Sequence, residues 1–144
     1  MIKKLILLFT AITFSFTVQQ ANAEGKGWKE LNDFHTIMSK TFHPTEEGNF
    51  EPLKKHASDL NASAKVWAAS EVPAGFDKEL TPKILAELVS KCEEIEKSVT
   101  AKSDDDMLKK QITEAHEIFH QIVEKCKKPE DGKAHEEHEG HDHK

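Results

Sequence analysis

The chain contains no arginine, because all 20 of its Lys and Arg residues are lysines. Arginine supplies the bidentate fork that proteins use against phosphate and guanine, and the formal net charge here is −6 at neutral pH. We therefore expect no nucleic-acid partner. Strand-like alternation of useful length is also missing from the sequence, which disfavours a sheet and leaves helices as the expected elements.

Long apolar runs are equally scarce, and the one that exists lies at the start of the chain. It spans residues 5–18, follows Lys3 and Lys4, and leads to the small-residue site Ala21-Asn22-Ala23. This pattern is typical of a secretory signal peptide, and the run is too short and polar for a confident membrane span. We predict that residues 1–23 are removed. The mature chain is then expected to be exported, periplasmic in a cell with two membranes, and not membrane-bound.

Four segments carry apolar residues at helical spacing and short links join them. We expect helices at 27–42, ended by His43-Pro44, and at 53–70, after a loop over 45–52. A third should begin at Thr81-Pro82 and a fourth after the acidic cap 103–106. These features predict an all-α domain over residues 24–128, an antiparallel up-down four-helix bundle. The four inner stripes are Leu31, His35, Met38 and Phe42 with Phe34 beside them; Leu53, Ala57, Leu60, Ala64 and Trp67; Leu85, Leu88, Cys92, Ile95 and Val99; and Leu108, Ile112, Ala115, Phe119, Ile122 and Cys126.

The composition changes at Pro129, after which nothing can bury a core. We predict a disordered tail over residues 129–144. Its histidines alternate with acidic residues and are expected to capture Zn, Ni or Cu weakly, an interpretation that we favour over a merely solvated, charge-rich terminus. These tail histidines are His135, His138, His141 and His143.

Histidine and sulfur side chains interrupt three of the helical stripes at similar heights. With a rise of about 1.5 Å per residue, they all fall about 10 to 16 Å from the end where the first helix starts. We expect His35, His116 and His120 as a first coordination shell, with Cys92 and Met38 as fourth or axial ligands. His43 and His56 fall near the opposite end and form a weaker, secondary set.

The chemistry of this set favours a transition metal. Imidazole with thiolate or thioether suits Zn, Cu or Fe, whereas Ca or Mg would require oxygen ligands. Each residue alone is more often plain packing, but several imidazoles in one buried layer would be costly without a ligand. The string from His116 to His120 also matches the metalloprotease pattern H-E-x-x-H. No sheet or third ligand accompanies it, so we do not expect an enzyme.

The two cysteines are predicted to remain unpaired within the domain. On the same height scale Cys126 lies near zero and Cys92 about 16 Å away, beyond the reach of a disulfide. Cys126 then either bridges two copies in a homodimer or is inert.

In architecture, the region from Trp28 to Lys127 resembles the superfamily of cytochrome c-prime and the soluble periplasmic b-type four-helix cytochromes. In sequence the resemblance is confined to residues 115–121, where His120 occupies the position of the family's haem-ligating histidine. Cysteines for covalent attachment would be needed at His116 and Phe119, which excludes c-type haem. The b-type members have a methionine where this chain has Trp28. The resemblance implies a non-covalent haem as the alternative cofactor, with His120 and either His35 or Met38 as axial ligands.

The sequence thus supports three hypotheses. The first is an exported protein that binds Zn or Cu for storage, delivery or detoxification, with a metallochaperone or redox protein as partner. The alternative is a b-type haem protein that transfers electrons. The third is a structural bundle whose histidines are incidental.

Overall fold

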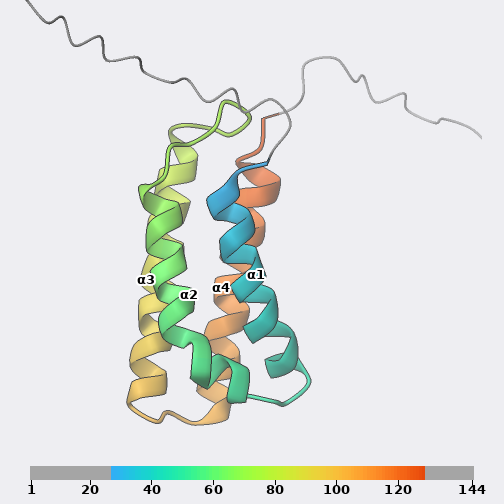
Figure 1. The fold of residues 1–144 in the computed structure, drawn as a ribbon, viewed down its shortest axis with the longest axis vertical. Helices are drawn as coiled ribbons and strands as arrows, with labels where there is room; N and C mark the ends of the chain where they lie inside the picture. The colour runs from blue at the N-terminus through green and yellow to red at the C-terminus, as the bar shows by residue number, and fades with distance from the viewer. Residues whose placement is uncertain (1–26, 129–144) are drawn as a thin grey trace, which may run out of the picture.

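A computed structural model describes residues 27–128 as four helices and their connections. The helices are α1 (Lys29–Glu46), α2 (Glu51–Ala69), α3 (Leu80–Thr100) and α4 (Asp105–Lys125). They run alternately up and down (Figure 1), and this part of the chain has no strand beyond an isolated bridge between Phe76 and Lys127. The predicted four-helix bundle is confirmed. The signal peptide and the tail predicted over 129–144 lie outside the described residues.

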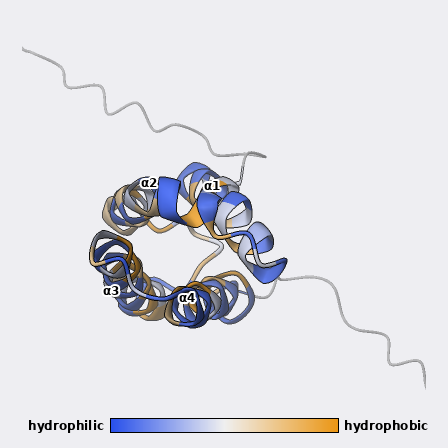
Figure 2. Cartoon of the chain, turned by 90° about the horizontal axis from the view of Figure 1, so that it is seen from below, coloured by the Kyte–Doolittle hydropathy of each residue, from blue (hydrophilic) through white to orange (hydrophobic). Residues whose placement is uncertain are grey.

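The helices form a ring in chain order, as the view along the bundle shows (Figure 2). Each helix packs against the next, and α4 returns to α1. The contact between α1 and α4 is much less extensive than the other three. We call this contact the α1–α4 seam. Within residues 27–128, no helix is apolar enough over a sufficient length to cross a membrane.

The core is built from the stripes that the sequence predicts on α2 and α4. Every predicted residue of these two stripes is buried, as are Leu85, Leu88, Cys92 and Ile95 of α3. Trp28 and Trp67 close one end with an edge-on contact at 5.4 Å between ring centroids. Both cysteines are buried free thiols, as the helix register predicts.

Helix α1 departs from the prediction in both its end and its buried face. It continues through Pro44 to Glu46, and its buried residues are Phe34, Met38, Thr41 and Thr45. Proline removes one helical N–H, but here it lies in the last turn. Three residues before the proline, the Thr41 hydroxyl donates to the carbonyls of Ile37 and Met38, both at 3.0 Å. Gly48 follows with φ +86°, a conformation that favours glycine and turns the chain toward α2.

The start of α3 also differs from the prediction, whereas that of α4 does not. Thr81 is not the cap, because the helix already begins at Leu80. Instead, the Asp77 carboxylate accepts hydrogen bonds from the backbone N–H groups of Glu79 at 2.8 Å and Leu80 at 2.7 Å. These bonds lower the pKa of Asp77. At α4, Asp104 is the N-cap and its carboxylate accepts from the Met107 N–H at 2.8 Å. The acidic cap of the fourth helix is therefore confirmed.

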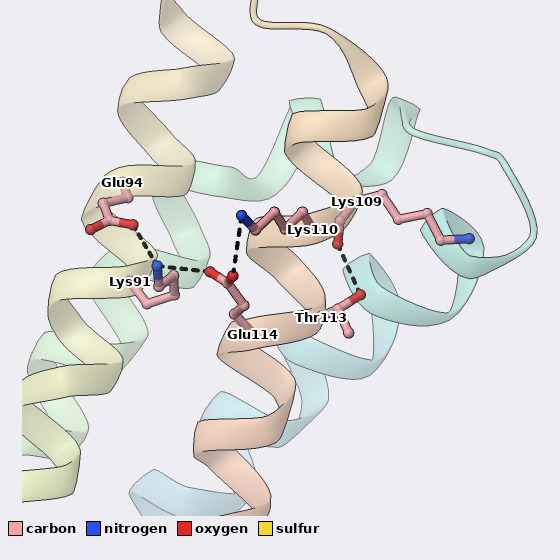
Figure 3. Close-up of polar contacts among 6 residues, drawn as sticks. All are labelled: Lys91, Glu94, Lys109, Lys110, Thr113 and Glu114. Carbon is pink, nitrogen blue, oxygen red and sulfur yellow. Dashed lines mark hydrogen bonds and ion pairs between the residues drawn. The ribbon is translucent and has the colours of Figure 1, made fainter.

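Ion pairs join α3 and α4 on the outside of the bundle (Figure 3). The Lys91 ammonium lies 2.7 Å from Glu94 on its own helix and 2.9 Å from Glu114 on α4. These carboxylates raise the pKa of Lys91, and Lys91 lowers the pKa of Glu114. By contrast, aromatic and imidazole rings occupy the α1–α4 seam.

Candidate metal site at the α1–α4 seam

Four of the histidines lie along the α1–α4 seam. His35 and His43 come from α1, and His116 and His120 from α4. His116 is half-buried, whereas the other three are exposed. We refer to these four residues as the seam histidines.

The predicted position of the imidazoles inside the bundle is therefore wrong. The buried face of α1 runs through Phe34 and Met38, and that of α4 through Ala115 and Phe119. His35, His116 and His120 each follow such a residue, and one residue turns a helix by about 100°. That rotation moves each imidazole from the core to the edge of the seam.

Two stacked pairs cross the seam in a reciprocal arrangement. The His35 ring of α1 stacks on Phe119 of α4, with 5.1 Å between centroids and 3° between planes. Phe42 of α1 stacks on His116 of α4 at 3.8 Å and 12°. Each helix thus supplies one imidazole and one phenyl ring, and each imidazole lies on the phenyl ring of the other helix. The stacks hold imidazoles from α1 and α4 close together.

His116 is the centre of the group. Its ring centroid lies 4.5 Å from that of His120, one turn further along α4, and 6.5 Å from that of His43 across the seam. Burial lowers the pKa of His116, and the positive charges of His120, His43 and His35 lower it further, against an opposite effect of Glu46. A lowered pKa favours the neutral imidazole, which is the form that binds a metal.

A carboxylate lies beside one ring nitrogen of His120. Its Nδ1 lies 3.2 Å from Oε1 of Glu124, one turn further along α4. If Nδ1 carries the proton and donates it to the carboxylate, Nε2 is the unprotonated nitrogen. This arrangement is common at metal-binding histidines, where the carboxylate fixes the tautomer and the orientation of the ring.

The two predicted sulfur ligands are separated from the imidazoles by burial. Met38 and Cys92 are both 0% exposed and belong to the hydrophobic core. Burial also raises the pKa of the Cys92 thiol to about 12, so that the metal-binding thiolate is disfavoured. The single layer predicted for all five residues is thus divided between an apolar interior and an exposed seam.

The secondary set is divided as well. His43 lies at the seam beside His116, whereas His56 of α2 pairs with Asp59 at 2.8 Å. The tail histidines His135, His138, His141 and His143 lie outside the described residues. Within residues 27–128, no three His, Cys, Asp or Glu side chains are already spaced to hold one ion. Binding at the seam therefore requires exposed rings to change rotamer.

Sequence reasoning missed the stacking role of Phe42 and Phe119 and the role of Glu124. A signal for them exists, since Phe42 follows His35 by two helical turns and Glu124 follows His120 by one.

Comparisons with protein-family models, with curated proteins and with solved structures give no match for this chain. The likeness to the cytochrome superfamily consequently stays a prediction.

Proposed function

We propose that this protein is an exported transition-metal-binding protein that holds Zn or Cu at the α1–α4 seam, for storage, delivery or detoxification. The observation that carries the proposal is the gathering of four imidazoles from two helices around His116. Imidazole nitrogen suits both metals. Binding would begin at His116 and His120 and recruit His43 or His35 from α1 by rotation of their exposed side chains.

Such an ion would join two helices that otherwise pack weakly. A ligand that binds only the folded state stabilises it, and the gain rises with the concentration of ligand above its dissociation constant. Metal binding at the seam should therefore raise the melting temperature. The tail would supply additional, weaker sites, and a metallochaperone or redox protein would be the partner.

The decisive experiment uses the full chain with the four tail histidines changed to glutamine, so that binding to the tail does not obscure the seam. We expect one Zn²⁺ or Cu²⁺ per chain by calorimetry, together with a higher melting temperature. The double variant His116→Gln/His120→Gln should lose both effects. His56→Gln, on α2, is the matched control and should keep them. Absence of stoichiometric binding in the chain with intact seam histidines would refute the proposal.

The geometry favours an ion over the alternative, a b-type haem. The axial ligands would be His120, whose side chain is 46% exposed, with either Met38, which is fully buried among core residues, or His35, whose exposed ring stacks on Phe119. Two surface grooves of the described residues, of about 570 and 320 Å³, are lined by none of these three residues. A Soret band after haem reconstitution that disappears in His120→Ala would reverse this preference.

A further inference from the structure

We infer that the seam histidines select divalent copper over zinc and exclude monovalent copper. This inference rests on the proposed function and names the ion that the site prefers. It follows from which donor atoms reach the seam and from how the two helices hold them.

The side chains with strong metal-donor atoms that the structure places at the seam are imidazoles and carboxylates. The rings of His35, His43, His116 and His120 lie there, with Glu124 beside His120 and Glu46 near His116. Thiolate and thioether ligands are the donors that select Cu(I). Nitrogen and oxygen donors with open positions suit Cu(II), which accepts a tetragonal arrangement.

The sulfur atoms lie inside the core and away from the seam. Met38 and Cys92 are fully buried, so an ion could reach either only by opening the packing around it. The Cys92 thiol is also held protonated by its apolar surroundings, which raise its pKa to about 12. The folded chain therefore offers Cu(I) no soft ligand at the seam.

The preference for copper over zinc follows from the freedom of the side chains. A rigid tetrahedral site can favour zinc by geometry, but no three potential ligands are prearranged within residues 27–128. Three of the four rings are exposed and His116 is half-buried, and all four come from the helix pair with the least extensive contact. Where the protein imposes no geometry, affinity follows the intrinsic order of the divalent ions, in which Cu²⁺ exceeds Zn²⁺.

Glu124 acts as a positioning residue in this site. Through its contact with Nδ1 of His120, it holds Nε2 toward the ion without binding the ion itself. Loss of such a carboxylate typically lowers metal affinity about 10- to 100-fold. Glu124→Gln should therefore weaken Cu²⁺ binding by about tenfold or more. Glu117→Gln, an equal charge change at an exposed position of α4, is the matched control and should leave the affinity unchanged.

The test measures the binding of three ions to the full chain in which the four tail histidines are changed to glutamine. Zn²⁺ and Cu²⁺ are compared by competition, the Cu²⁺ complex is examined by electron paramagnetic resonance, and Cu⁺ is offered anaerobically against a Cu⁺ chelator. We expect Cu²⁺ to bind at least about tenfold more tightly than Zn²⁺, nitrogen hyperfine coupling from two or more imidazoles, and no retention of Cu⁺. Met38→Leu and Cys92→Ala should alter none of these results.

Two results would contradict the proposed selectivity: zinc binding as tight as Cu²⁺ binding, and retention of Cu⁺ that disappears in Met38→Leu. Neither result would contradict the proposed metal-binding function. Failure of all three ions to bind would instead refute the proposed function itself. An unchanged Cu²⁺ affinity and spectrum in Glu124→Gln would exclude the positioning role.

Discussion

At the scale of single residues, His116 makes stability depend on pH in the metal-free protein. Its pKa in the folded chain lies below the ordinary value of 6.5, first because of burial and then because of neighbouring imidazolium charges. The unfolded chain therefore binds protons at a higher pH than the folded chain does. Stability from this residue is fully present above about pH 6.5 and is lost as pH falls from that value through the lower pKa of the folded chain.

We predict that the free energy of unfolding decreases between pH 7.5 and 5.5, and that it decreases less in His116→Gln. Urea unfolding with a chelator present measures both. The carboxylates with lowered pKa values, such as Glu93 and Glu114, lose their stabilising contribution only as pH falls below their ordinary value of 4.5, which is outside this window. An identical pH dependence in the variant and the parent would contradict the assignment.

The burial of both thiols leads to a second residue-scale prediction. Cys92 is 0% exposed and Cys126 is 1% exposed, and the pKa of Cys92 is raised to about 12 by burial. A thiol-reactive disulfide reagent at pH 8 should therefore label neither residue quickly in the native protein and both residues in urea. Rapid labelling of one thiol under native conditions would show that its helix opens locally.

The positions of the imidazoles show what a residue pattern can and cannot predict. Counting the helical rise places His35 near the height of His116 and His43 near the opposite end, yet across the seam His116 stacks on Phe42 and lies 6.5 Å from His43, whereas His35 stacks on Phe119. Which face of α1 is buried is harder to predict from the sequence, because His35 and Phe34 fit the apolar stripe of this helix almost equally well. The larger apolar surface of phenylalanine decides the rotation, and the imidazole turns outward.

At the scale of elements, capping determines where the helices begin, and the cap of α4 can be tested directly. Asp104→Ala removes the acceptor for the Met107 N–H and should cost about 1 kcal/mol of stability by urea unfolding. Asp104→Asn is the matched control, since its side-chain oxygen can accept the same bond, and should cost far less. Equal losses in the two variants would mean that charge rather than capping matters at this position.

The helix ends were only partly predictable for local physical reasons. Asp104 precedes its helix directly, so the sequence shows its role. Asp77 stands three residues before Leu80 and accepts from the first N–H groups near the start of α3, but the pair Thr81-Pro82 gives a competing start signal a few residues later. Likewise, Pro44 signals a helix end, yet a proline in the last turn removes only one helical N–H, and α1 continues to Glu46.

At the scale of the whole molecule, the bundle is a ring with one weak junction. Apolar stripes fill the contacts from α1 through α2 and α3 to α4. The less extensive α1–α4 seam is made by the core pair Phe34 and Phe119, two stacked imidazole–phenyl pairs and a few polar contacts. Among the polar contacts, the Lys109 ammonium lies 3.8 Å from a Glu46 carboxylate oxygen. Partial opening of a protein begins where buried apolar contact is least, so the seam should open before the α2–α3 contact.

This expectation can be measured by hydrogen exchange, peptide by peptide, in the metal-free chain. Amides of α1 and α4 that face the seam should exchange faster than those of α2 and α3, because opening the seam requires the least loss of buried surface. Addition of Cu²⁺ should slow exchange in both α1 and α4, since an ion held by imidazoles of the two helices must be released before they separate. His56→Gln should respond to Cu²⁺ as the parent does, and His116→Gln/His120→Gln should not respond. Slowing confined to α4 would mean that His116 and His120 bind the ion without a ligand from α1, so that the ion does not link the two helices.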